Sequence, residues 1–114
     1  MSRHDDSVSL SDMLSHAREA SELLGKRSSE ELAKDRVLQL ALTHLVEIVG
    51  EVANRVSPAT RQQYVEVPWP QIIGMRNRLV HGYDVIDLEL LWDTVTTDLP
   101  PLIKSLEEIV EQDD

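Results

Sequence analysis

The sequence is organised around residues 37–56, VLQLALTHLVEIVGEVANRV, the longest helical pattern in this chain of 114 residues. Acidic side chains near residues 28–31 favour a helix start there, and Ser57-Pro58 ends the pattern after Val56. The apolar side chains are spread too widely around this helix to form one stripe, so the helix must bury two faces. A homodimer interface would cover the second face economically, and a central position in a bundle is the alternative.

Helical patterns lie on both sides of this segment. Between residues 10 and 24, apolar side chains recur at steps of three and four, with Ser9 or Ser11 as the expected N-cap and Gly25 as the expected C-cap. A last pattern begins after Asp87, another expected N-cap, and stays in phase across residues 100–101, two prolines that we expect to kink or briefly break the helix.

Residues 57–70 form a connection interrupted by prolines, and residues 67–70 should be extended because a residue before proline disfavours the helical region. A short helix is predicted from about Trp69 to Val80, ending near Gly82, and no useful run of strand-like alternation occurs. The predicted fold is all-α, a four-helix up-down bundle with a short third helix and a Pro-kinked last helix. Residues 1–8 should form a flexible N-terminus, and residues 9–112 a single domain.

The composition is that of a globular domain and excludes several classes of protein. Hydrophobic residues make up 41% of the chain, and the absence of cysteine excludes a disulfide scaffold, a thiolate metal site and a cysteine nucleophile. No run approaches the roughly 18 apolar residues of a membrane helix, and residues 1–6 contain no apolar signal core. We therefore expect a cytoplasmic domain that has no membrane partner.

The charge is unevenly distributed along the chain. The net charge is −10, yet residues 53–83 carry four arginines against a single glutamate. This basic segment is where an anionic ligand would bind, because acidic residues predominate on both sides of it.

The same basic segment contains residues 74–83, GMRNRLVHGY. On a helix, Asn77 and His81 are four residues apart, so the Asn77 amide could orient the imidazole. Arginine can neutralise charge on phosphate oxygens, and histidine can move protons near neutral pH, so the segment has the ingredients of phosphodiester chemistry. The alternative is a capping or surface histidine beside solvated arginines.

The segment also resembles a known signature. Arg76, four intervening residues and His81-Gly82-Tyr83 are similar to the R-x4-H-x-Y motif of the HEPN ribonuclease superfamily, specifically of HepT-like toxins. Residues 47–51, 68–83, 91–92 and 98–100 resemble the corresponding parts of that family, so that the resemblance covers roughly residues 9–112. The chain departs from the family pattern at His44, where relatives commonly carry an arginine.

The resemblance implies a HEPN-like bundle that dimerises, bringing two motifs together across a cleft. It implies an endoribonuclease that needs neither metal nor cofactor and cuts RNA by attack of the substrate 2′-hydroxyl. Arg76 would stabilise charge on the reacting phosphate, His81 would transfer protons and Asn77 would support them. Tyr83 corresponds to the tyrosine to which a cognate MNT-type nucleotidyltransferase antitoxin adds AMP, which would block RNA by bulk and negative charge.

Two further alternatives stay open from the sequence. Arg78 is expected to contact RNA phosphate, although an ion pair with Asp84 or Asp87 fits equally well. The acidic net charge favours a different function, in which a non-catalytic HEPN-like dimer binds RNA, nucleotide or a nucleotidyltransferase partner without cutting. No pair of histidines has metal-ligand spacing, and no glycine-rich phosphate loop occurs, so neither a metal site nor a nucleotide-hydrolysis site is expected.

Overall fold

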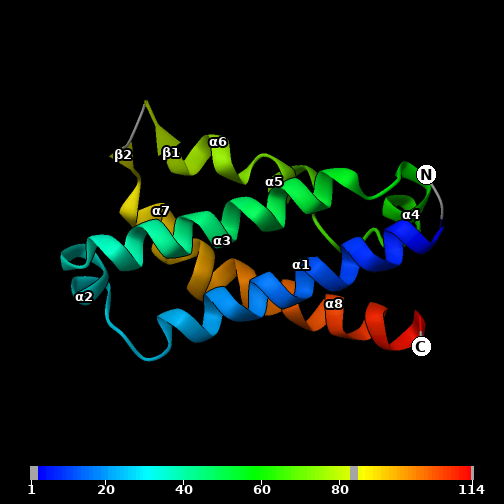
Figure 1. The fold of residues 1–114 in the computed structure, drawn as a ribbon, viewed down its shortest axis with the longest axis horizontal. Helices are drawn as coiled ribbons and strands as arrows, with labels where there is room; N and C mark the ends of the chain where they lie inside the picture. The colour runs from blue at the N-terminus through cyan, green and yellow to red at the C-terminus, as the bar shows by residue number, and fades with distance from the viewer. Residues whose placement is uncertain (1–2, 83–84, 114) are drawn as a thin grey trace.

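Four helical tracks run antiparallel along the long axis of the molecule (Figure 1). The structure is a computed structural model that describes residues 3–82 and 85–113. In that part of the chain the predicted all-α up-down bundle is confirmed. The tracks are α1 (Arg3–Leu24), α3 (Arg36–Arg55), α5 with α6 (Trp69–Ile73 and Met75–Leu79), and α7, η1 and α8 (Leu88–Asp93, Thr94–Asp98 and Leu99–Asp113). Two short helices lie in the connections, α2 (Ser29–Lys34) and α4 (Pro58–Gln63).

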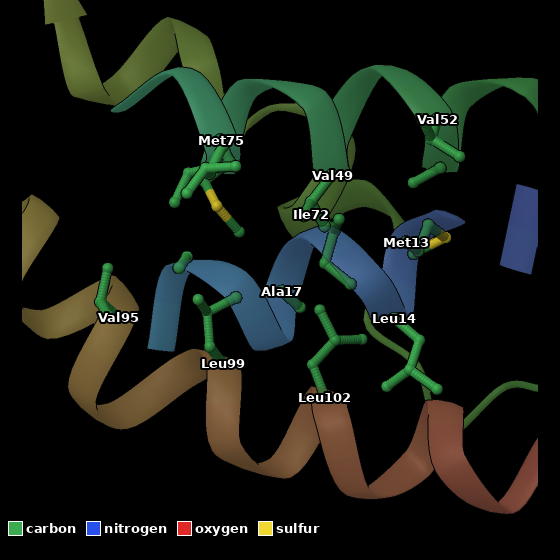
Figure 2. Close-up of a cluster of buried hydrophobic side chains, with 14 of the residues drawn as sticks. Met13, Leu14, Ala17, Val49, Val52, Ile72, Met75, Val95, Leu99 and Leu102 are labelled. Carbon is green, nitrogen blue, oxygen red and sulfur yellow. The ribbon is translucent and has the colours of Figure 1, made fainter. Parts of the chain in front are cut away.

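The hydrophobic core lies between α1 and its neighbours. Helix α1 packs against α3 on one side and against α8 on the other, and α5 and α6 pack on α3. Figure 2 shows side chains from all of these tracks meeting in one cluster, among them Met13, Val49, Met75, Leu99 and Leu102. Each track therefore contributes apolar side chains to a common core, as the three- and four-residue periodicity predicts, and α3 is covered on two sides.

Helix α1 begins earlier than predicted. The expected caps at Ser9 or Ser11 are wrong, because the helix starts at Arg3 and residues 3–8 of the segment expected to be flexible are helical. Asp6 is buried, and its carboxylate accepts hydrogen bonds from the Ser57 amide (3.0 Å), the Ser57 hydroxyl (2.5 Å) and the Thr60 hydroxyl (2.6 Å). These bonds tie the first turn of α1 to the N-terminus of α4.

The hydrogen bonds to the Asp6 carboxylate make the stability of the fold depend on pH. Burial of the Asp6 carboxyl group would raise its pKa, but hydrogen bonds from Ser57 and Thr60 favour the charged form and hold the pKa below its ordinary value. Because the folded-state pKa lies below that of the unfolded chain, ionised Asp6 stabilises the fold above about pH 4, and this contribution is lost progressively as the pH falls further.

We expect Asp6→Asn to lower the free energy of unfolding at pH 7 by about 2 kcal/mol, because charge-assisted hydrogen bonds are lost. The difference from the parent should shrink as the pH falls below about 4, where the parent loses the same charge. Urea unfolding at pH 7 and pH 3 measures both effects, and Asp12→Asn, an exposed aspartate on α1, is the matched control. If the free energies of unfolding of parent and variant differ by the same amount at both pH values, ionised Asp6 does not stabilise the fold as described.

The predicted helix over residues 28–56 is interrupted once. Helix α2 ends at Lys34, and Asp35 leaves the helical region at φ −118° and ψ 94° before α3 begins at Arg36. The Asp35 carboxylate accepts a hydrogen bond of 3.0 Å from the Leu38 amide, so Asp35 is the N-cap of α3. A continuous helix was the wrong prediction here because a side-chain cap competes with the helical backbone at this aspartate.

The connection over residues 57–70 is more helical than predicted. Ser57 caps α4, which starts at Pro58, and α5 starts at Trp69, so the expectation of an extended Trp69-Pro70 is wrong. Proline is compatible with the first turn of a helix because the amide it lacks has no partner there. The Trp69 indole donates a 3.0 Å hydrogen bond to the Tyr64 carbonyl, which fixes the start of α5.

The last track confirms the predicted start, but it stays helical across the prolines, and a wide turn before them takes the place of the expected kink or break. The Asp87 carboxylate accepts a 3.0 Å hydrogen bond from the Leu90 amide and caps α7. The wide π-helical turn η1 follows and leads directly into Pro100 and Pro101 at the start of α8. Neither proline can donate a hydrogen bond to the preceding turn, and their rings crowd the carbonyls of that turn, which favours the wider helix before them.

Helix α3 is also the most apolar helix of the chain. By length and composition residues 36–55 are sufficient to cross a membrane, with a mean hydropathy of 1.2 over 18 residues. In the structure this helix lies inside the bundle, where α1 covers one side and α5 and α6 cover another. The core helix of a helical bundle has the same composition, and the packing accounts for it here.

Candidate functional site

The motif segment forms a short helix followed by a tight hairpin. The predicted helix over residues 69–80 is wrong in two places: Gly74 separates α5 from α6, and Val80 leaves the helix at φ −113° and ψ 122°. Val80–His81 (β1) pairs antiparallel with Val85–Ile86 (β2), and Figure 1 shows this hairpin projecting from one end of the bundle. Gly82 turns the chain at φ +66°, a conformation that glycine adopts most readily.

The hairpin changes the expected relation between Asn77 and His81. Because His81 lies on β1 and not on α6, the two side chains do not share a helical face, and among the described residues no hydrogen bond joins them. Both side chains are exposed. Tyr83, the expected modification site, and Asp84 lie outside the described residues.

A glycine on α3 lets the motif segment approach closely. A Cβ atom at Gly50 would lie 2.8 Å from the Ile72 carbonyl oxygen, so α5 passes α3 at a distance that excludes any side chain there. This contact brings α5 and then α6 alongside α3, as Figure 1 shows. Gly50 therefore sets where the arginines of α6 lie relative to α3.

We expect Gly50→Ala to destabilise the fold despite the better helix propensity of alanine. The propensity gain is about 1 kcal/mol, whereas overpacking against a backbone carbonyl costs about 1–3 kcal/mol, so the net change is a loss of up to about 2 kcal/mol. Thermal unfolding of the variant and the parent measures the difference. A variant more stable than its parent would show that α5 does not pack this closely on α3.

Arg76 faces α3 and meets a carboxylate there. Its Nε donates a 3.3 Å hydrogen bond to Oε2 of Glu47, and the two groups form an ion pair. The Arg76 side chain is 57% exposed, whereas that of Glu47 is 23% exposed. The expected anion-binding arginine is thus held at its base by α3 while most of it remains accessible to solvent.

Arg78 faces away from Arg76, toward the preceding helix. Its guanidinium donates a 2.8 Å hydrogen bond to the Gln71 carbonyl, and it forms no ion pair within the described residues; Asp87 is occupied as the cap of α7. Arg78 also lines a groove of about 560 Å³ between α5–α6 and η1–α8, whose floor is mainly apolar. The other lining residues are Glu66, Pro68, Gln71, Ile72, Met75, Leu90, Thr97, Asp98, Leu99, Pro101, Leu102 and Ser105.

Sequence reasoning missed the role of Glu47. It lies 29 residues from Arg76 in the sequence, and as a single acidic residue on a helix it has the signature of a solvated side chain. Two features of the sequence mark it: Glu47 interrupts an apolar run, and it lies in residues 47–51, which resemble the HEPN family. In the part of the chain described, no group of three or more His, Asp or Glu side chains lies close enough together to hold a metal ion.

Residues 76–81 carry two exposed arginines and an exposed histidine. Arg76 and Arg78 come from the two sides of α6, and His81 follows two residues after its end. Exposed guanidinium groups bind phosphate through paired N–H donors, and an imidazole can act as a general acid or base. The region is suited to binding and reacting with a phosphodiester.

The comparisons with known proteins agree on one family. The family model described as "Ribonuclease HepT-like" matches residues 13–109. The chain is 33% identical over 104 residues to a "Putative RNase" of Caldanaerobacter subterraneus subsp. tengcongensis, covering 88% of this chain and 93% of the relative. It is 32% identical over 107 residues to a "Putative RNase" of Methanocaldococcus jannaschii, covering 94% of this chain and 98% of the relative.

A third relative has a more specific name. The chain is 30% identical over 102 residues to the "Probable ribonuclease HepT" of Thermococcus cleftensis, covering 86% of this chain and 93% of the relative. No solved structure matches the chain significantly.

Proposed function

Because the chain belongs to the HepT-like ribonuclease family, we propose that it is a metal-independent endoribonuclease and the toxin of a toxin–antitoxin pair. The observation that carries the proposal is that Arg76, Arg78 and His81 are all exposed and lie close together in the sequence, within the basic segment of an acidic chain. RNA is the substrate class because its 2′-hydroxyl is an internal nucleophile next to the phosphate.

The proposed reaction uses only protein side chains. His81 transfers protons as the 2′-oxygen attacks the adjacent phosphorus, and the bond from phosphorus to the 5′-oxygen breaks. The products are a 2′,3′-cyclic phosphate and a 5′-hydroxyl end, which receives a proton. Arg76 stabilises the negative charge that builds on the phosphate oxygens, and Asn77 offers an amide beside it. Arg78 contacts a phosphate farther along the strand.

A homodimer is part of the proposal. Most of the wide apolar surface of α3 is covered within the chain by α1, α5 and α6, so the central-bundle explanation accounts for the larger share of it. Two large apolar side chains of α3 are exposed: Val37 is 76% exposed and Leu40 is 47% exposed. They precede Glu47 on the same helix, so that pairing of this face would bring two copies of the site toward each other.

The proposal includes control by an MNT-type nucleotidyltransferase that adds AMP to Tyr83. The motif order His81-Gly82-Tyr83 supports it, since a phosphate added two residues after His81 in the sequence would compete with RNA for the arginines. The intact mass of purified protein, before and after incubation with the partner enzyme and ATP, tests this part. Addition of one adenylyl group should occur in the parent and be absent in Tyr83→Phe.

Cleavage of a mixed RNA pool in the presence of EDTA tests the proposed function. The parent protein should cut the RNA, and cleavage should not require added metal. Intact RNA after incubation with protein of unmodified mass would overturn the ribonuclease proposal. Binding without cleavage, with a steep dependence on salt, would favour the non-catalytic module that the acidic net charge supports.

A further inference from the structure

The ion pair between Glu47 and Arg76 has little to do with fold stability. More than half of the Arg76 side chain is exposed, and ion pairs of this kind contribute little to the free energy of folding. Glu47 is nonetheless the more buried partner, on a long helix whose other face lies in the core. The contact therefore joins a fixed carboxylate to an arginine on a helix of only five residues.

The atoms of the contact indicate what it does. Arg76 uses Nε, and within the part of the chain described its terminal nitrogens make no hydrogen bond. A guanidinium has five N–H donors, and the pair of terminal nitrogens forms the fork that binds a phosphate through two parallel hydrogen bonds. A carboxylate that engages Nε restrains the guanidinium at that nitrogen while it leaves the fork open.

A second contact of α3 supports the same geometry. Gly50 lies three residues after Glu47, on the same face of the helix, and its missing side chain allows the Ile72 carbonyl to approach. One position of α3 thus sets the distance to the motif segment, and the other holds the arginine that this segment carries.

We propose that Glu47 is a positioning residue that orients the Arg76 guanidinium for the reacting phosphate, an inference that rests on the proposed ribonuclease function. Glu47 has two opposing effects. It restrains the Arg76 guanidinium, and its negative charge weakens the attraction of the site for RNA. Loss of the carboxylate should therefore lower kcat without raising KM.

For Glu47→Ala we expect kcat for RNA cleavage to fall on the order of 10- to 100-fold, since misplacement of a charge-stabilising group by about 1 Å has effects of this size. KM should stay constant or fall, because one negative charge beside the bound phosphate is removed. Glu47→Gln keeps an acceptor oxygen at the same chain length and should recover part of the lost kcat.

The matched control is Glu51→Ala. Glu51 lies one turn further along α3, is exposed, and makes no side-chain hydrogen bond within the described part of the chain. Removing it changes the net charge by the same amount, so it should leave kcat within about twofold of the parent, within the scatter expected of a surface substitution. Equal kcat values for Glu47→Ala and Glu51→Ala would overturn the inference while the ribonuclease function stands.

A readout without catalysis separates the two proposals. In NMR spectra of ¹⁵N-labelled parent, Glu47→Gln and Glu51→Gln, the Arg76 Nε–H signal should shift and exchange faster with water only in Glu47→Gln. This result in a protein that cuts no RNA would overturn the proposed function but support the positioning of Arg76. An Arg76 signal unchanged by Glu47→Gln would overturn the positioning role whether or not RNA is cut.

Discussion

Arg76→Ala and His81→Ala are each expected to lower the rate of RNA cleavage by about 10²- to 10⁴-fold, the range found when a charge-stabilising or proton-transferring group is removed. Both side chains are exposed and lie at the edge of the bundle, so their removal should leave the helical content and thermal unfolding of the parent unchanged. Initial rates on one labelled RNA, together with circular dichroism melts, measure both expectations.

The control for these substitutions is Arg55→Ala. Arg55 belongs to the same basic segment and is exposed at the end of α3, outside the motif. If RNA binds only through general attraction to positive charge, Arg55→Ala and Arg76→Ala should weaken cleavage equally. Cleavage by both motif variants at the parent rate would refute the assignment of Arg76 and His81 as catalytic residues.

The second large effect is expected on assembly. Leu40→Glu and Val37→Glu should turn a dimeric parent into monomers, because each places a charge in an apolar contact, and we expect dimerisation to weaken by at least about 100-fold. Light scattering over a range of protein concentrations measures the change. RNA cleavage should fall together with dimer content if two copies of the motif form one cleft.

Val65→Glu is the matched control for assembly. Val65 is 77% exposed, as apolar as Val37, and lies in the turn between α4 and α5 rather than on α3. It should leave the dimer intact. A parent that is already monomeric in light scattering would contradict the two-motif cleft, and equal effects of all three substitutions would place the interface elsewhere.

The helical tracks could be predicted because their periodicity is local information. Side chains such as Leu10, Met13 and Ala17 recur at helical steps, and their burial follows directly from that pattern. The caps at Gly25 and Asp87 were predictable for the same reason, since a helix end depends on a few neighbouring residues.

The helix boundaries that were predicted wrongly depend on contacts between distant residues or on a close competition between two local backbone conformations. Asp6 extends α1 because Ser57 and Thr60, more than 50 residues away, supply hydrogen bonds to its carboxylate. At Asp35 a side-chain cap and a continuous helix are both compatible with the local sequence, and the chain adopts the cap.

The candidate site was predictable in its composition and less so in its geometry. The arginines and His81 could be found from their clustering in one basic segment. Their arrangement depends on the change from helix to strand at Val80, where two short strands pair across the Gly82 turn. The partner of Arg76 comes from another helix, so no spacing within the motif indicates Glu47.

The most direct test of the central claim is the chemical nature of the RNA ends produced in EDTA by the parent and by His81→Ala, side by side. The account predicts fragments with 2′,3′-cyclic phosphate and 5′-hydroxyl ends from the parent, and intact RNA from the variant. Fragments with 5′-phosphate ends, or the same fragments from both proteins, would contradict a reaction driven by the 2′-hydroxyl with His81 as its proton carrier.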